Sequence, residues 1–540
     1  MRFTQPLQPR KYSIVDNAVV LTVLAILSPI AGLALEMVLA WRFGATETVD
    51  SFRIASLVLV FGNQVFLGQV LPHVVVPLFS EYSAKKLEQD AWRLVASLFG
   101  IFGLISLVFA IWVWFYPATL VDLLGPGLSG SGRADAFLFV RYFSLAFVLM
   151  ALSGVVSGVL YCHQVFWPPV AAQVLTNLFA IAAIIAVGRE WGSASLVIGI
   201  LLGSLAMFVL HLYYLLRVAR TSNIDLPALL RLGPWDGVAR AVRLSAPLLG
   251  MIFIGQWSII IINRVLSEMP PGTLANFGYA WKLLALVGIL PTSLATVIFP
   301  AFSAARARRD ATELSRLITR AVRMTLLLTV PFAAFLYVMR TPIVSLLLER
   351  GAMNKAAVMD TIEFLGLLLI GATAGALMGI LYKAFFSVQD TKSPAIAAFV
   401  SALAITWLVP YGASVAGATG VAWAYNAITW VSVLGLFAYH IWRYRVMRFW
   451  DLWIYSGLLT LLCLGIAVPA IAIRFLFEST YTTVPAIMTL FELVVIAMIS
   501  ISISYYLSRL LGIRETSDLW EYLRRRSAEV LSRKGPAQNE

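Results

Sequence analysis

The chain has 540 residues, of which 60% are hydrophobic and only 12% are charged. Soluble globular proteins carry about 25% charged residues, so this composition, with a mean hydropathy of +0.87, excludes that class. A net charge of +13 would suggest a nucleic-acid partner in a soluble protein. Here the basic residues follow a membrane topology instead, and no nucleic acid is expected as a partner.

Apolar stretches long enough to cross about 30 Å of hydrocarbon recur along the whole chain. They predict an all-α polytopic membrane protein with about 14 transmembrane helices. The first stretch runs from about Asn17 to Ala40, which is too long for the apolar core of a cleavable signal peptide, so we expect it to remain as the first helix. The expected spans lie at about 16–42, 51–79, 93–116, 136–161, 166–187, 193–216, 244–266, 274–302, 318–338, 358–388, 395–412, 416–441, 453–476 and 484–511.

A short polar turn, WRFGATETVDSF at residues 41–52, joins the first two spans. It contains Gly44 and two carboxylates, Glu47 and Asp50. Asp50 is a candidate N-cap of the second helix, because its carboxylate can accept from the N–H groups two and three residues further on. Arg53 lies about one helical turn after Asp50 and is a candidate ion-pair partner for Asp50 or Glu47 on the same helix face.

Most of the 40 Lys and Arg residues fall in alternate connecting segments when the N-terminus is placed inside. The positive-inside rule then predicts that both termini are cytoplasmic and that the turn at 44–50 lies on the outer face of the membrane. The basic tail is expected either to lie on the inner leaflet through its apolar residues or to be solvated.

The two halves of the chain repeat each other. Three pieces recur in order at nearly one offset: VPLFSEYSAKK (76–86) with FPAFSAARARR (299–309), GVVSGVLY (154–161) with GALMGILY (375–382), and LSPIAG (27–32) with LSAPLLG (244–250). Each copy holds six spans, so we expect two parallel six-helix lobes around a central cavity that alternates access. The predicted parts are an N-terminal lobe over 1–220, a C-terminal lobe over 221–445, two extra helices over 446–512 and a basic cytoplasmic tail over 513–540.

Several of these motifs resemble those of the MurJ (MviN) lipid II flippase family, within the MOP superfamily of polysaccharide flippases and multidrug exporters. FGATETVDSF is similar to the family hairpin F-G-A-x-x-x-x-D-A-F, and VPLFSEY follows the second span as in the family. FFSVQDTKSP, residues 385–394, is similar to F-Y-S-x-x-D-x-x-T-P after the tenth span. The resemblance covers roughly residues 20–510.

The resemblance implies a MurJ- and MATE-like plan of two six-helix lobes, with a cavity that accepts a pyrophosphate and sugar headgroup. It implies that the two helices within 446–512 form a groove for a polyprenyl tail. The turn between the first two helices would belong to an outer gate that includes Gly44 and Asp50. The implied location is the bacterial inner membrane.

Most of the cavity arginines that the family carries are replaced in this chain. The family pattern S-R-x-x-G-x-x-R-[DE] of the first helix appears as SPIAGLALE, residues 28–36, with Pro29 and Leu35 at the arginine positions. An arginine of the second helix appears as Asn63, and one of the eighth, in a Y-A-D-R pattern, appears as Lys282. The site must therefore be rebuilt from other residues or serve a different headgroup.

Five residues form the candidate substrate-binding set: Lys282, Arg53, Arg264, Glu36 and Asn63. A charge at mid-membrane costs roughly 2.5–3.5 kcal/mol on insertion scales, which favours a functional or paired role. Lys282 is the strongest candidate, because apolar residues flank it and no basic residue is near. Arg264 lies near a helix end, where it can instead reach the interface. Glu36 is mid-helix, and we hypothesise that it pairs with Lys282 or Arg53.

The leading prediction is a flippase that moves a polyprenyl-pyrophosphate-linked saccharide, lipid II or a related precursor, from the inner to the outer leaflet. Two alternatives stay open: a cation-coupled exporter of the same superfamily, and a non-transporting scaffold. Membrane lipids and proteins of cell-envelope synthesis are candidate partners. The sequence has no P-loop, H-E-x-x-H motif or nucleophile elbow, so an enzyme is not expected. We expect no cofactor or metal, and transport driven by the membrane potential or an ion gradient.

Overall fold

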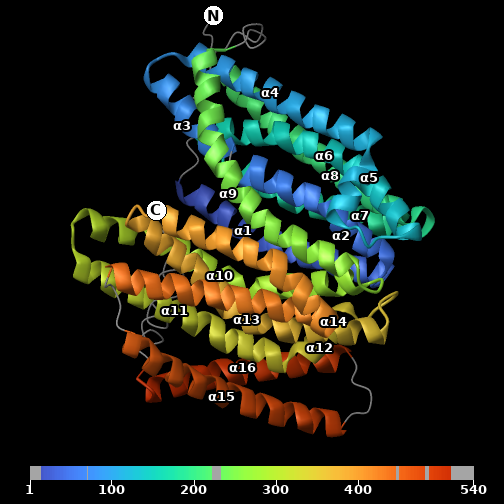
Figure 1. Ribbon diagram of the computed structural model, residues 1–540, viewed down its shortest axis with the longest axis vertical. Coiled ribbons are helices and arrows are strands. Elements are labelled where there is room, and N and C mark those ends of the chain that lie inside the picture. Colours follow the sequence, from blue (N-terminus) through green and yellow to red (C-terminus); the bar gives the residue numbers. More distant parts are fainter. Residues whose placement is uncertain (1–13, 70, 222–232, 445–448, 481–485, 513–540) are drawn as a thin grey trace, which may run out of the picture. The chain divides into compact units, whose positions relative to one another are not determined.

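The computed structural model describes residues 14–69, 71–221, 233–444, 449–480 and 486–512. Within these ranges the chain is helical apart from short connections, and the predicted basic tail over 513–540 lies outside them. In chain order the elements are α1 (Ile14–Phe43), α2 (Glu47–Gly62), the π-helix η1 (Asn63–Gln69), α3 (Leu71–Ala84), α4 (Glu88–Phe115), α5 (Pro117–Leu124), α6 (Gly130–Cys162), α7 (Trp167–Trp191), α8 (Ala194–Thr221), α9 (Trp235–Ser267), α10 (Thr273–Ala307), α11 (Ala311–Val338), α12 (Arg340–Leu348), α13 (Lys355–Ser387), α14 (Lys392–Tyr444), α15 (Phe449–Thr480) and α16 (Ala486–Leu510) (Figure 1).

Thirteen helical runs in the described residues are long and apolar enough to cross a membrane. One of them, α14, contains two spans, because the backbone leaves the helical conformation at Ala416 and at Gly417. Near this turn the two halves touch through backbone atoms: a Cβ on Gly420 would stand 1.9 Å from the carbonyl oxygen of Gly412. The halves correspond to the spans expected over 395–412 and 416–441. The prediction of an all-α membrane protein with about 14 spans is confirmed.

The second span, expected as one helix, contains a turn of different geometry. α2 passes into the π-helix η1 at Asn63, and α3 continues the span from Leu71. Pro72, in the first turn of α3, has no N–H to donate to the carbonyl four residues earlier, so one hydrogen bond of the α-helical ladder is missing at this junction. The π turn ends shortly before Pro72, and such turns are frequent at functional sites.

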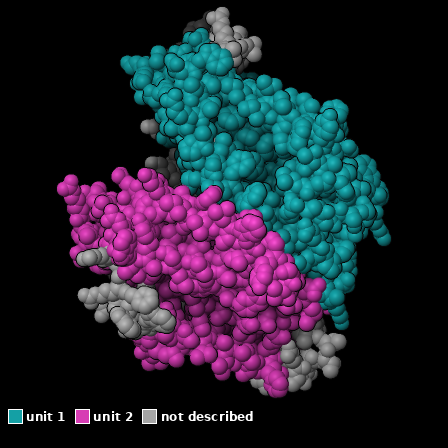
Figure 2. Space-filling model, in the orientation of Figure 1, with its two compact units in different colours: residues 1–279, 350–357 teal, residues 280–349, 358–540 magenta. Residues whose placement is uncertain are grey.

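The described chain forms two compact units (Figure 2). Unit 1 comprises residues 1–279 and 350–357, and unit 2 comprises residues 280–349 and 358–540. Unit 1 thus takes in α9 and the first turns of α10, together with a short segment that follows α12. The lobe boundaries expected from the repeat, at 220 and 445, stay a prediction.

In unit 1 the central element is α6, which packs against α2, α3, α4 and α8. Its glycines permit close approach: a Cβ on Gly154 would stand 2.3 Å from the carbonyl oxygen of Phe66, and one on Gly158 would stand 2.6 Å from Cβ of Val75. The two glycines of GVVSGVLY, residues 154–161, are spaced as G-x-x-x-G and therefore form a surface against which the broken second span packs.

In unit 2 the motif FFSVQDTKSP forms the turn between α13 and α14. The Asp390 carboxylate accepts from the backbone N–H of Ser393 at 3.0 Å, from the Ser393 hydroxyl at 2.6 Å and from the Tyr444 hydroxyl at 2.9 Å. It therefore caps the start of α14 and ties it to the end of the same element. Burial opposes ionisation, but these hydrogen bonds outweigh it and lower the pKa of Asp390 below its ordinary value.

Candidate functional site

The hairpin between α1 and α2 turns at Gly44, whose φ of +64° lies in the left-handed region that favours glycine. Its N–H donates to the carbonyl oxygen of Ala40 at 2.9 Å and closes the last turn of α1. α2 then begins at Glu47, with Thr46 in extended conformation at the N-cap position. The turn predicted between the first two spans is therefore present between Phe43 and Glu47.

Three glycines of unit 1 hold this hairpin against two other segments, and we call Gly44, Gly272 and Gly351 the glycine clasp. All three have positive φ, at +64°, +88° and +61°. A Cβ would meet a backbone carbonyl oxygen at 2.5 Å on Gly44, at 2.3 Å on Gly272 and at 2.2 Å on Gly351. The oxygens belong, in that order, to Ala352, Ala45 and Trp41.

The clasp also contains a backbone hydrogen bond, because the N–H of Ala352 donates to the carbonyl oxygen of Trp41 at 2.9 Å. Three segments that are far apart in the sequence, 41–46, 270–275 and 350–353, thus meet backbone to backbone. The side chain of any other residue would force them apart, so the chemistry of glycine fixes this contact.

Gly351→Ala is expected to destabilise unit 1 more than Gly130→Ala does. Both positions have positive φ, which costs an alanine about 1–2 kcal/mol, but a Cβ on Gly130 meets nothing within 4 Å. The thermal unfolding midpoint of each purified variant in detergent measures the difference. Equal midpoints would show that the close approach at Trp41 does not constrain the fold.

Asp50 does not cap its own helix, as one reading of the sequence suggested. Its carboxylate reaches the start of α10, where it accepts from the N–H of Gly272 at 2.6 Å and from the N–H of Ala275 at 2.7 Å. The side chain is buried, with 5% of the residue exposed. Asp50 therefore satisfies two of the orphan donors at the α10 N-terminus and places a carboxylate at the positive end of that helix dipole.

The first turn of α2 is also fixed to α6. The Glu47 carboxylate accepts from the Ser131 hydroxyl at 2.9 Å and from the N–H of Gly132 at 3.2 Å. The Ser51 hydroxyl donates to the carbonyl oxygen of Gly132 at 2.6 Å. Both carboxylates of the hairpin motif therefore receive hydrogen bonds at the starts of other helices.

Glu36 and Arg53 form a buried ion pair between α1 and α2. Two guanidinium nitrogens of Arg53 bind the two carboxylate oxygens of Glu36, one of them at 2.9 Å. The side chains are only 8% and 15% exposed, respectively. This bidentate geometry is the strongest that a carboxylate and a guanidinium can adopt. The hypothesis that Glu36 pairs with Arg53 is confirmed, while the alternative that Arg53 pairs with Asp50 or Glu47 is wrong.

Tyr279 of α10 links this ion pair to the hairpin. The Arg53 guanidinium lies 5.2 Å from the centre of the Tyr279 ring. The Tyr279 hydroxyl donates to the carbonyl oxygen of Gly44 at 2.8 Å. Glu36, Arg53, Tyr279 and Gly44 therefore form one connected polar chain inside unit 1, and we call it the hairpin network.

The other predicted residues are not members of this network. Asn63 donates to the Gln173 side chain on α7 at 2.6 Å. Arg264 donates to the carbonyl oxygen of Leu123 at 3.1 Å, at the end of α5. Lys282 is half-buried on α10 and belongs to unit 2.

Four residues that matter here were missed by sequence reasoning: Gly272, Gly351, Tyr279 and Gln173. Tyr279 stands in the segment YAWK beside Lys282, and this proximity was the one available signal. The others lie more than 100 residues from their contacts in the hairpin or on Asn63. No local pattern marks them.

The sequence is similar to those of known membrane transport proteins. The family model described as lipid II flippase MurJ matches residues 39–496. The chain is 28% identical over 398 residues to the lipid II flippase MurJ of Burkholderia cenocepacia, covering 72% of this chain and 75% of the relative. It is 24% identical over 483 residues to the probable lipid II flippase MurJ of Treponema pallidum, covering 86% and 89%.

Solved structures show the same fold. The structure of a lipid II flippase MurJ in an inward closed conformation aligns with a TM-score of 0.76 at 21% identity, over 91% of this chain and 99% of that one. An inward-facing MATE multidrug transporter of the MOP superfamily aligns with a TM-score of 0.67 at 15% identity, over 79% and 98%. Because the family model covers most of its length, this multi-pass membrane chain belongs to the lipid II flippase MurJ family.

Proposed function

We propose that the chain translocates lipid II, or a closely related polyprenyl-pyrophosphate-linked saccharide, from the inner to the outer leaflet of the bacterial inner membrane by alternating access. Both termini would then be cytoplasmic, and the hairpin between α1 and α2 would face outward. The observation that carries the proposal is the family match over residues 39–496, which includes the hairpin turn, the broken second span and all pieces of the repeat except LSPIAG at 27–32.

Arg53 is the residue of unit 1 that we assign to the pyrophosphate. It is neutralised by Glu36 in this structure. A phosphate can replace the carboxylate at the same guanidinium fork, because each presents a pair of anionic oxygen acceptors that Arg binds bidentately. Such an exchange would free Glu36 and alter the contact of Arg53 with Tyr279. Substrate binding would in this way affect the hydrogen bond that Tyr279 donates to Gly44 in the hairpin.

Lys282 is the cation of unit 2 that we assign to an anionic substrate. It lies within the apolar span of α10, and no ion pair of Lys282 occurs among the described residues of its own unit. Holding a charge in such a span costs roughly 2.5–3.5 kcal/mol. An anionic substrate would offset that cost, so a role in substrate binding accounts for a lysine at this position.

Asn63 and Gln173 suit the saccharide part of the headgroup. Their side chains bond each other at 2.6 Å inside apolar spans, and Gln173 is exposed. Exposed amides at membrane depth are costly against lipid and are tolerated where they line a polar cavity. Amide groups both donate and accept, which is the chemistry that sugar hydroxyls require.

A pocket in unit 2 suits the polyprenyl tail. It has a volume of about 380 Å³ and lies between α11, α13 and α15. Its lining is almost wholly apolar and includes Val330, Ile370, Leu464 and Ala467. The volume is within the range of about 300–1,000 Å³ that is usual for sites enclosing an organic ligand. We therefore assign the tail to this pocket, which α15 helps to line.

We assign the driving force to the membrane potential or an ion gradient. A unit charge gains about 2.3 kcal/mol per 100 mV, so a cavity with one unpaired cation responds to the potential. A cation-coupled exporter would instead need a free carboxylate in the membrane. Glu36 is held by Arg53 in this structure, which disfavours that assignment for it.

Rescue of a bacterium depleted of its own lipid II flippase tests the proposed function. The wild-type chain is expected to restore growth, and Lys282→Arg to retain most of it because the charge is kept. Lys282→Ala is expected to lose rescue. Lys383→Ala is the matched control, since it removes another cation of unit 2, one that lies over the Phe299 ring. Failure of a well-inserted wild-type chain to rescue would contradict the proposal.

A further inference from the structure

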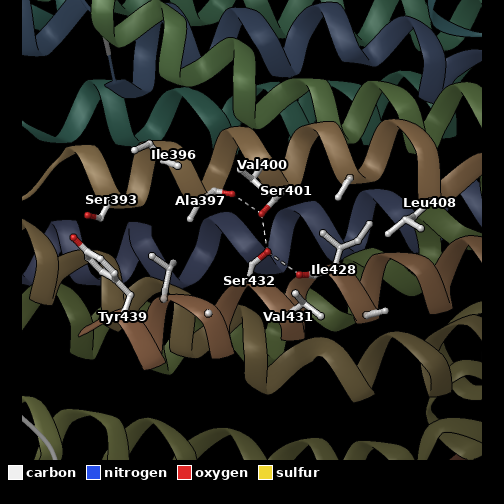
Figure 3. A pocket seen from close by; sticks show the side chains of 14 residues that line it. Ser393, Ile396, Ala397, Val400, Ser401, Leu408, Ile428, Val431, Ser432 and Tyr439 are labelled. Atoms are coloured by element: carbon white, nitrogen blue, oxygen red, sulfur yellow. Dashed lines mark hydrogen bonds between the residues drawn. The ribbon is translucent and has the colours of Figure 1, made fainter. Parts of the chain in front are cut away.

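The two halves of α14 touch at their turn and leave an open groove along the rest of their length. The groove has a volume of about 500 Å³, and its walls come from α14 alone (Figure 3). Small residues on both halves, Ala397, Ala404 and Gly435, leave the space open, while larger ones such as Val400 and Ile428 line it. We call this space the α14 groove.

The serine hydroxyls in the middle of the α14 groove are already paired. The Ser401 and Ser432 hydroxyls lie 2.6 Å apart and bond across the groove floor (Figure 3). The Ser401 hydroxyl also lies 2.7 Å from the carbonyl oxygen of Ala397, and the Ser432 hydroxyl 2.7 Å from that of Ile428, so their two protons have three acceptors within reach. These hydroxyls have no proton left to donate to an occupant. The α14 groove therefore suits an apolar chain.

The surroundings of the α14 groove are also apolar. It lies in a membrane-spanning element, and Ile396, Val400 and Val431 on its rim are 64%, 56% and 70% exposed. Water in the middle of this space could donate only to the lone pairs of the two serine hydroxyls, and an empty groove would lose the dispersion contacts of its lining. Hydrocarbon from the bilayer is therefore the occupant with the most favourable free energy.

One end of the α14 groove is positively charged. This end is marked by Ser393 and Tyr439 (Figure 3). Lys392 precedes Ser393, and Arg443 lies one helical turn beyond Tyr439; both cations are exposed. The nearby Asp390 carboxylate is engaged by Ser393 and Tyr444. Exposed cations at a membrane surface attract anionic lipid headgroups.

We propose that the α14 groove binds one acyl chain of an anionic glycerophospholipid, whose headgroup lies at Lys392 and Arg443. The site is separate from the pocket between α11, α13 and α15 that we assign to the substrate tail. It does not depend on the proposed transport activity, because its ligand is a lipid of the bilayer and not the cargo.

Photocrosslinking in vesicles tests this site. The full chain is reconstituted in phosphatidylcholine vesicles that contain phosphatidylglycerol with a diazirine on one acyl chain, irradiated and mapped by peptide mass spectrometry. Crosslinks are expected in 393–408 and 427–439. Ala404→Trp, which fills the α14 groove, is expected to lower them at least fivefold. The matched control is Leu403→Trp: Leu403 is exposed on the same helix and does not line the groove, so the yield should not change.

A headgroup arm completes the test. A phosphatidylcholine probe with the same diazirine chain is expected to label the α14 groove about tenfold less than the phosphatidylglycerol probe, since two cations attract the anionic headgroup. The double variant Lys392→Gln, Arg443→Gln is expected to remove this difference. Equal labelling by both probes in the wild type would overturn the proposal. So would labelling that survives Ala404→Trp, or preferential labelling of the α14 groove by a diazirine polyprenyl phosphate.

Discussion

Replacing Glu36 with alanine is expected to destabilise the protein by about 3–5 kcal/mol, because it leaves the Arg53 guanidinium buried without its anion. The loss would appear as a lower thermal unfolding midpoint of the purified protein in detergent. Glu190→Ala is the matched control, since it removes an exposed carboxylate at the end of α7 in the same unit. The midpoint of that variant should stay within the error of the wild type.

A double variant separates the structural role of the pair from its role in transport. Replacing a buried ion pair with apolar residues of similar volume is often neutral or stabilising, so Glu36→Leu with Arg53→Met should recover most of the stability. It should still fail to rescue growth, because no guanidinium remains for the pyrophosphate. A double variant that is stable and also rescues would refute our assignment of Arg53 to the substrate.

Asp50→Ala is the second change with a large expected effect. It strips two buried N–H groups, those of Gly272 and Ala275, of their acceptor. Each unsatisfied buried donor costs about 1–3 kcal/mol, so we expect a loss of about 2–6 kcal/mol. Asp50→Asn should lose less, because the amide keeps one oxygen acceptor. Hydrogen exchange followed by mass spectrometry should show faster exchange at 272–279 in the alanine variant.

A cap at another helix supplies the control for Asp50. Asp310 accepts from the N–H of Glu313 at 2.9 Å at the exposed start of α11. Asp310→Ala should cost about 0.5–2 kcal/mol, as an ordinary N-cap does, and should leave exchange at 272–279 unchanged. If Asp50→Ala costs no more than Asp310→Ala, the link between the hairpin and α10 does not support the fold as we describe.

Local patterns predicted the parts of the fold that depend on neighbours in the sequence. Hydropathy placed the spans, and the break within α14, at Ala416 and Gly417, lies within two residues of the expected gap between the spans 395–412 and 416–441. The π turn at Asn63 was missed, because the pattern of apolar residues does not change where Pro72 interrupts the ladder.

The candidate site was predicted only in part, for a similar reason. Glu36 and Arg53 were recognised as charges that need partners, and their pairing was one of the hypotheses. Asp50 was recognised too, but its acceptor role is directed at donors 222 and 225 residues away. The start of α10 is too far away in the sequence to leave a signal near Asp50. The start of α2 is adjacent to Asp50, and for this reason the sequence suggested a cap there, which is wrong.

Direct observation of lipid II crossing a bilayer tests the central claim most closely. The purified chain is reconstituted in vesicles that contain fluorescent lipid II, and the fraction reached by a membrane-impermeant quencher is followed over time with a potential imposed across the membrane. We predict that the wild-type chain moves lipid II between leaflets well above the rate of protein-free vesicles, and that Lys282→Ala falls close to that background. A folded, wild-type chain that leaves lipid II in its original leaflet would contradict the account.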